Sequence, residues 1–583
     1  MKNLFLIVLT CLPSILIQAQ VAFTIVSPAS ISGGYEFTSN GDAPNWGLPN
    51  LNNPADAILD TVVIYQDTSS GINAQGVPHA NEGCAPAINN LAGKIALIYR
   101  YDGASTNDCY AGTKVLNAQN AGAIGVILVN RVDGVYGYNG TTDGPLTTIP
   151  FAFIGKTDGA IIRAKIENGE DVVAFIGNKL GLFNDDIGIV KEKTIAPTLG
   201  ATAALTSMTQ GEFGFDIGTK IFNYGNNTQS GITLTATVNG PSGNWTQTAG
   251  PFTLATGDSI DVFTGGSNSI PSFSMTSYPA GNYELSYVVS LGNTDESAFD
   301  NDLTYNFVIN QEKISYSKTN PVTNLPVPST FTRSVDPNFS ACMVYKNENA
   351  NRLAASGMYF ATEPGYNTGV QLDGEEFGVS LYEWNDNFID MNDAAYGFTN
   401  LSIVANGSYT FGPNQESTMV FAPFNIPLLL QSNQRYLACV DVWNDNFWIG
   451  FSNRVDYSRN IDHYLQPLAP VSSNSTYYTV GFGSNMVPSI ALGVFDASTI
   501  SVNELTDQSI NIYPNPANKF ITIEGAAAES ELQIIDLSSR TVTSQIIEIS
   551  LESIDLSEIK SGHYFMKLTS KDGNVRTVKF SKL

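Results

Sequence analysis

Histidine is almost missing from this chain: its 583 residues include only His79, His463 and His563. Zinc hydrolases draw several of their ligands from imidazole, and serine or cysteine hydrolases need a histidine as the base. The sequence also lacks the H-E-x-x-H and G-x-S-x-G motifs that accompany these two chemistries. These absences argue against a peptidase. We expect a protein that is not an enzyme and has no catalytic residue, metal site or cofactor.

Two carboxylates alone can hydrolyse a glycosidic bond, so counting histidines does not exclude every hydrolase. The alternative to a non-catalytic protein is therefore a peptidase or glycosidase with an unrecognised site in residues 313–500. A folded structure discriminates between the two, because the enzyme needs a pocket with two facing carboxylates, or His463 beside a nucleophile.

Positive charge and long hydrophobic runs are also scarce. Lys and Arg number 28 against 54 Asp and Glu, and the net charge of -26 repels nucleic acid and anionic lipid surfaces. The one long apolar run, residues 4–17, follows Lys2 and precedes Ala19, which is typical of a signal peptide at residues 1–20. We expect export, a secreted or outer-surface location, no nucleic acid partner and no transmembrane span in the mature chain.

Cysteine is rare as well, and Cys11 lies in the expected signal peptide. The other four, Cys84, Cys109, Cys342 and Cys439, can pair in three ways. The simplest pairing joins Cys84 to Cys109 and Cys342 to Cys439, because each bond then lies inside one domain of an exported protein. We expect the second bond to join two sheets.

Strand and helix periods alternate in the first third of the chain. Residues 95–99 and 124–129 are apolar strand patterns, and between them residues 111–122 carry apolar side chains at helical spacing. Residues 151–154 predict a further strand, and Thr157 is the expected cap of the helix that follows. The pattern indicates a small sheet covered by helices.

Several elements of this region occur in the order found in protease-associated (PA) domains. In chain order they are Gly83 and Cys84, GKIALIYR, Cys109, NAQNAGAIGVILVN and a Thr-Ile-Pro sequence. The sequence resembles a PA domain over residues 55–180, and we place the domain at 21–190. One departure is the segment YDGASTND, which delays the second cysteine. The resemblance implies a non-catalytic lid or recruitment module. His79 is expected to be a surface histidine of this module.

Residues 191–312 predict short strands in which apolar and polar positions alternate around turns such as YGNN and DESAFDND. This pattern resembles immunoglobulin-like domains of the bacterial cell-adhesion-related class. The acidic turn, residues 295–302, lacks the spacing of a known calcium loop, so we interpret it as a solvated turn.

Residues 313–500 predict a second, jelly-roll-like β-sandwich of unknown ligand. The string WNDNF occurs in it twice, and its residues Trp384, Asp386, Trp443 and Asp445 are the candidate ligand surface. Exposed tryptophan rings beside amides and carboxylates suit a sugar or a peptide. The alternative is a pair of hairpin corners with each tryptophan packed inward.

The last region, residues 511–583, follows an expected linker at 501–510 and reads as short strands separated by turns. It contains Tyr513, Pro514, Asn515 and Pro516 in the string YPNPA, and later an IDLS segment followed by Gly562 and Tyr564. These strings resemble type IX secretion C-terminal sorting domains of Bacteroidetes-type bacteria. The resemblance implies contact with the type IX secretion machinery and export across the outer membrane.

The sequence thus predicts a mainly β multidomain protein: a PA-type α/β domain, then immunoglobulin-like and jelly-roll-like β-sandwiches, then a small C-terminal β-sandwich. Its expected function is binding of a protein, peptide or glycan outside the cell.

Overall fold

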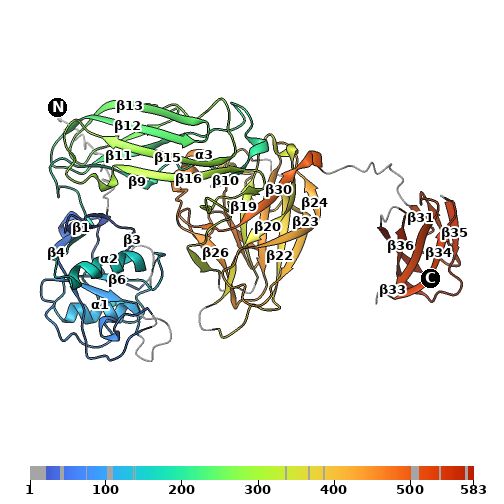
Figure 1. The fold of residues 1–583 in the computed structure, drawn as a ribbon, viewed down its shortest axis with the longest axis horizontal. Helices are drawn as coiled ribbons and strands as arrows, with labels where there is room; N and C mark the ends of the chain where they lie inside the picture. Colours follow the sequence, from blue (N-terminus) through green and yellow to red (C-terminus); the bar gives the residue numbers. More distant parts are fainter. Residues whose placement is uncertain are drawn as a thin grey trace, which may run out of the picture. The chain divides into compact units, whose positions relative to one another are not determined.

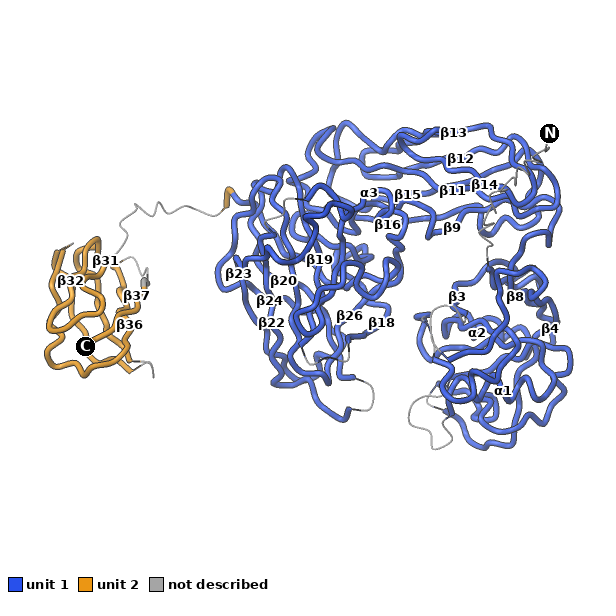
Figure 2. Tube along the Cα trace, turned by 180° about the vertical axis from the view of Figure 1, so that it is seen from behind, with its two compact units in different colours: residues 1–497 blue, residues 498–583 orange. Residues whose placement is uncertain are grey.

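The computed structural model describes residues 21–39, 45–73, 75–100, 109–135, 137, 139–334, 336, 338–365, 368–384, 388–499, 511–536, 540–549, 551–571 and 575–583. The expected signal peptide and linker lie outside these residues. The chain forms two compact units, Met1–Ala497 and Ser498–Leu583 (Figure 2). The architecture is mainly β, with one α/β sheet at the N-terminal end and several antiparallel sheets after it, as the sequence predicted.

The N-terminal sheet lies in the blue to teal part of Figure 1, together with α1 (Ala111–Asn120) and α2 (Lys156–Glu167). Its strand order within the described residues is β2-β1-β8-β4-β5-β6-β7-β3. Its strands are β1 (Val21–Ser27), β2 (Gly33–Gly34), β3 (Phe37–Thr38), β4 (Ile58–Ile64), β5 (Ile95–Tyr99), β6 (Gly125–Val129), β7 (Phe151–Ile154) and β8 (Val173–Asn178). Strands β4 to β7 pair in parallel, and β1, β3 and β8 add antiparallel neighbours.

The helices α1 and α2 cover opposite faces of this sheet. Val115 of α1 packs in one apolar cluster, and Ile162 of α2 packs in the other. The expected cap at Thr157 is wrong, because the helix already begins at Lys156. Instead, Asp133 caps it from outside by accepting the backbone N–H of Thr157 at 2.7 Å.

The next region consists of two facing sheets, in the orders β10-β16-β15-β12-β13 and β14-β11-β9. The strands are β9 (Ile187–Thr194), β10 (Ala201–Ala203), β11 (Gly218–Asn223), β12 (Gln229–Gly240), β13 (Gly243–Leu254), β14 (Ser259–Phe263), β15 (Gly281–Ser290) and β16 (Asp302–Asn310). Alternating residues of β12 and β15 are buried, which is the pattern of a sheet with one face in a core.

A larger pair of sheets follows, in the orders β17-β30-β20-β24-β23-β22-β25-β19-β27-β28 and β18-β26-β21, with β29 paired to β26. The strands are β17 (Lys313–Ile314), β18 (Thr330–Thr332), β19 (Phe339–Tyr345), β20 (Leu353–Phe360), β21 (Thr362–Pro364), β22 (Glu376–Trp384), β23 (Leu401–Thr410), β24 (Val420–Leu429), β25 (Arg435–Val442), β26 (Phe447–Ser452), β27 (Val471–Ser473), β28 (Thr476–Tyr478), β29 (Val487–Pro488) and β30 (Ala491–Asp496). The helix α3 (Ser458–Tyr464) lies between β26 and β27. One continuous apolar cluster runs from Ile187 to Val494 and so joins both sandwiches.

The second unit consists of two small sheets, in the orders β31-β32-β35 and β34-β33-β36-β37. The strands are β31 (Asn511–Tyr513), β32 (Phe520–Glu524), β33 (Ser530–Asp536), β34 (Thr541–Ile547), β35 (Leu551–Asp555), β36 (Gly562–Thr569) and β37 (Val575–Lys582). They enclose their own apolar cluster, which includes Ile521, Ile534 and Phe580.

Candidate functional site

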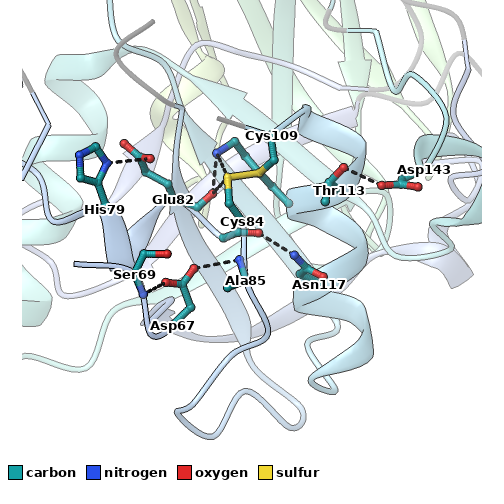
Figure 3. The surroundings of a disulfide bond; sticks show 12 residues. Asp67, Ser69, His79, Glu82, Cys84, Ala85, Cys109, Thr113, Asn117 and Asp143 are labelled. Carbon is teal, nitrogen blue, oxygen red and sulfur yellow. Dashed lines mark hydrogen bonds and ion pairs between the residues drawn. A yellow bond between two sulfur atoms is a disulfide. The ribbon is translucent and has the colours of Figure 1, made fainter. Parts of the chain in front are cut away.

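The first disulfide joins Cys84 to Cys109 at the start of α1, which is the pairing expected from the sequence (Figure 3). Beside it, the buried Lys114 donates from Nζ to the backbone oxygen of Glu82 at 2.6 Å. Asn117, one turn further along α1, donates to the backbone oxygen of Gly83 at 2.9 Å. These contacts hold the loop before β5 against α1, so the polar side chains here stabilise the fold.

His79 lies in the same loop, within contact of a buried carboxylate (Figure 3). Its Nδ1 is 3.1 Å from Oε2 of Glu82, and Asn73 donates to the other oxygen of Glu82 at 3.0 Å. Both oxygens of Glu82 therefore have partners within the loop. Among the described residues, no group of three or more His, Cys, Asp and Glu side chains is arranged to hold a metal ion.

A cavity of about 1020 Å³, which we call the junction pocket, lies between the N-terminal sheet and the sandwich that begins with β9. Its lining includes the aromatic side chains of Tyr35, Phe37 and Phe222. Five consecutive residues of β9 also border it: Ile189, Val190, Lys191, Glu192 and Lys193. Residues 190–193 lie in an irregular part of β9, between the ladder pairs Ile189–Ile221 and Thr194–Thr219. Because β9 is the last strand in the order β14-β11-β9, this stretch borders the pocket at the edge of the sheet.

Charges of both signs line the junction pocket. Glu36, which lies between β2 and β3, is 3.5 Å from Nζ of Lys191 and 4.0 Å from Nη1 of Arg454. All three side chains are more than one-third exposed, so a ligand can exchange with these ion pairs at little cost.

Three charged side chains are buried beside the junction pocket, and we call them the junction triad: Lys179, Asp186 and Asp300. Lys179 Nζ lies 2.8 Å from Oδ1 of Asp186 and 2.7 Å from Oδ2 of Asp300. Burial raises the pKa of Asp186 to about 7, against the opposing effect of Lys179, and the negative charge of Asp300 raises it further. Burial also raises the pKa of Asp300.

Sequence reasoning did not single out the junction triad. Asp300 belongs to the acidic turn considered for calcium, but in the structure the cation beside it is the ammonium of Lys179. The signal that could have found the triad is a lysine placed directly after the apolar strand β8, where an unpaired charge is costly.

The two WNDNF segments do not form one surface. Trp384 is 1% exposed and Trp443 is 55% exposed. Trp384 ends β22 opposite Arg435, whereas Trp443 follows β25 at the other end of the same strand pair and packs over Gly378. The candidate surface is therefore wrong for Trp384, which fits the inward-packed alternative. Asp386 lies outside the described residues.

Apolar and aromatic neighbours explain the burial of Trp384. Its ring stacks on Phe398 at 4.6 Å and meets Phe388 at 5.4 Å, and its Nε1 donates to the backbone oxygen of Gly397 at 3.1 Å. Trp443 remains exposed next to Asp445, and these two stay a candidate contact surface.

The second disulfide joins Cys342 to Cys439 under the Trp384 cluster, which is again the expected pairing. The two cysteines face each other on the neighbouring strands β19 and β25. The expectation that this bond joins two sheets is wrong, since both strands belong to the same sheet.

His463 lies in α3, and its Nε2 is 2.9 Å from Oδ2 of Asp216. A cavity of about 480 Å³ lies near this helix, and among its described lining residues the only carboxylate is Glu212. Arg352 engages that carboxylate through both Nη atoms at 3.0 Å. This pocket thus holds neither facing carboxylates nor His463 itself.

The YPNPA string lies beside the last strand of the second unit. Asn515 accepts the backbone N–H of Ser581 at 3.0 Å and donates to the backbone oxygen of Lys579 at 3.2 Å. Tyr564, which follows Gly562, stacks on Phe580 and donates to the backbone oxygen of Lys560 at 2.9 Å. The contacts of Asn515 therefore hold the turn after β31 against β37.

Comparison with protein families gives two matches. Residues 62–162 match the PA domain, and residues 511–581 match the secretion system C-terminal sorting domain. The chain therefore contains a PA domain and a type IX secretion sorting domain, and it is secreted to the outer surface or the extracellular space. No helix among the described residues has the length and apolarity needed to cross a membrane. No curated protein matches the chain.

Among solved structures, an aminopeptidase from Aneurinibacillus sp. strain AM-1 is 21% identical, covers 27% of this chain and 30% of its own, and has a TM-score of 0.19. BSAP, a zinc aminopeptidase from Bacillus subtilis, is 18% identical over 32% of this chain and 41% of its own, with a TM-score of 0.17. PorZ, a surface component of the type IX secretion system of Porphyromonas gingivalis, is 13% identical over 63% of this chain and 43% of its own, with a TM-score of 0.13. The chain thus spans less than half the length of each, and these scores carry no argument about function.

Proposed function

We propose that this type IX secreted, PA-containing chain is a non-catalytic binding protein, and that it holds an extended peptide segment of a protein ligand in the junction pocket. The observation that carries this proposal is the row of consecutive β9 residues along the pocket. Among the described residues, β9 is an edge strand whose sheet neighbour is β11. An edge strand offers backbone N–H and C=O groups to an added strand.

The pocket's side chains support a peptide as the ligand. Tyr35, Phe37 and Phe222 provide apolar contact area, which suits the side chains of a polypeptide. Lys191 and Arg454 lie beside Glu36, so either sign of side-chain charge can find a partner. A neutral sugar would leave these charges without a matching group.

The absence of catalysis is part of the same proposal. The three histidines contact different groups: His79 contacts Glu82, His463 contacts Asp216 and His563 contacts Ser581. This separation supports a protein without a zinc hydrolase centre, because such a centre gathers several ligands in one place. We also propose that the two sandwiches are immunoglobulin-like and jelly-roll-like, and that Trp443 with Asp445 is a secondary contact.

The test uses the mature, disulfide-bonded chain and an array of extended peptides of mixed charge. Lys191→Glu reverses one charge at the pocket and is expected to weaken peptide binding about tenfold, or about 1.4 kcal/mol. Lys94→Glu is the matched control, since Lys94 is 38% exposed and paired to Asp60, and Lys191 is 39% exposed and paired to Glu36. Equal loss in both variants, or no captured peptide, contradicts the binding site. Turnover of casein or of a glycan by the same preparation contradicts the non-catalytic assignment.

A further inference from the structure

The junction triad places two carboxyl groups beside one amine in a buried site. Lys179, Asp186 and Asp300 are 1%, 0% and 7% exposed. Within the described residues, Oδ2 of Asp186 and both oxygens of Asp300 are buried without a hydrogen-bond partner. Leaving two buried carboxylates with one ammonium costs several kcal/mol, and a bound proton reduces that cost.

The surroundings of the amine are those of a shielded reaction site. Nζ of Lys179 lies 4.4 Å from the ring centre of Tyr224 and 5.1 Å from that of Phe299. Aromatic rings on these sides shield the amine from water. Exclusion of water favours a condensation, because water is its product.

We propose that Lys179 and Asp300 form an intramolecular amide bond, with Asp186 acting as the base. The bond would be a covalent cross-link between the end of the N-terminal α/β region and the turn that precedes β16. This inference is independent of the proposed function.

The atoms and charges of the reaction balance. The triad starts with one ammonium on Lys179, one carboxylate on Asp186 and one protonated carboxyl on Asp300. Asp186 takes a proton from Nζ, the neutral amine attacks Cγ of Asp300, and the C–N bond forms as the C–OH bond breaks. The hydroxyl leaves with a second proton of the amine as water. The products are an amide, one water molecule and a neutral Asp186, so no net charge is created and no oxidant or reductant is needed.

The geometry assigns these separate roles to the two carboxyl groups. Asp186 Oδ1 accepts an aligned hydrogen bond from Nζ at 2.8 Å, which is the path of a proton transfer. Asp300 Oδ2 is as close, at 2.7 Å, but it is not in a hydrogen-bond alignment with any donor among the described residues. Nζ therefore already lies beside the carboxyl group of Asp300 that it would attack.

Gly188 of β9 makes room for Asp300. A Cβ at this position would lie 2.1 Å from Oδ2 and 2.5 Å from Cγ of Asp300. Any larger residue would push the carboxyl away from Nζ without changing the charges of the triad. Gly188→Ala is therefore a steric test of the reaction.

The direct test is the mass of the purified mature chain after both disulfides are reduced. The cross-linked protein is expected to be lighter than its sequence by one water molecule. Its protease digest is expected to contain the Lys179 peptide and the Asp300 peptide as one joined species. The digest is needed because an aspartate that cyclises elsewhere loses the same mass. A wild-type digest with separate peptides, or with Lys179 joined to Asp186, overturns the proposal.

Variants separate the cross-link from a simple ion pair. Lys179→Arg keeps the charge but replaces the amine, and Asp186→Asn removes the base, so both are expected to have the full mass. Gly188→Ala is also expected to have the full mass of its sequence, because the added methyl group moves the carboxyl of Asp300 away from Nζ. Lys94→Arg, a change at the surface pair with Asp60, is the control that keeps the joined peptide. Because the wild-type digest alone decides the matter, a variant that fails to fold does not weaken the test. A joined species that persists in Lys179→Arg also overturns the proposal.

Discussion

The same five residues, WNDNF, have opposite surroundings at the two ends of one strand pair. Trp384 stands at the end of β22 and is buried, whereas Trp443 follows β25 and is mostly exposed. Gly378, the residue under Trp443, lies six positions before Trp384 in β22, which is about 20 Å along a strand. The difference shows that distant residues, such as Phe398 and Tyr477, decide which tryptophan belongs to a core.

The largest expected difference in stability comes from removing the ring of Trp384 in one variant and that of Trp443 in another. Trp384→Ala is expected to destabilise the fold by about 3–5 kcal/mol, because it removes a fully buried aromatic side chain and leaves a cavity. Trp443→Ala is the matched control and is expected to cost under about 1 kcal/mol. Urea unfolding of the two variants measures both values. Equal losses would contradict the assignment of one ring to the core and the other to the surface.

The second prediction concerns the disulfide under Trp384. Replacing Cys342 and Cys439 by alanine is expected to cost about 2–4 kcal/mol, since the bond closes a loop with a sequence separation of 97. Replacing Cys84 and Cys109, whose separation is 25, is expected to cost less by roughly 1 kcal/mol on the same chain-entropy argument. Thermal unfolding with and without reductant gives the comparison. A larger loss for the first disulfide would show that local strain or contacts outweigh loop length.

The smallest effect is a pH dependence at the Trp443 end of the strand pair. Asp441 is 8% exposed and accepts hydrogen bonds from Ser340 and Ser380 at 2.7 and 2.6 Å. Burial raises the pKa of Asp441, against the lowering effect of these two bonds. The stability that its protonated form adds is present below the unfolded pKa of about 3.9 and is lost as the pH rises through the folded pKa.

Asp441→Asn keeps the shape of the side chain and removes this titration. Relative to the variant, the wild type is expected to gain stability on the order of 1 kcal/mol when the pH falls from 7 to 4. Unfolding curves of both proteins at the two pH values test the sign. A wild type that loses stability relative to the variant on acidification would mean that the hydrogen bonds outweigh burial.

Local periodicity predicted the α/β region well. The expected strands at residues 95–99 and 151–154 are present with the same bounds, and α1 begins at the expected residue 111. These elements are readable because their apolar spacing is set within a few residues. The cap at Thr157 failed because the group that satisfies its N–H, Asp133, comes from another loop.

Local sequence patterns did not predict which distant strands and side chains lie next to each other. The pairing of Cys342 with Cys439 was predicted, but the sheet that contains both was not, because strand order depends on contacts between distant segments. The junction triad was missed for the same reason: Lys179 and Asp300 are far apart in the chain, and neither carries a motif. The sequence predicted the local features of the candidate site, but it did not predict which distant residues come together there.

The C-terminal unit has a core of its own, built only from residues between Ala517 and Phe580. A core assembled within one contiguous stretch of chain can form without the rest of the protein. The unit nevertheless leaves Phe520, Ile546 and Leu551 more than half exposed, so these side chains, and not its interior, are where a separated fragment would associate.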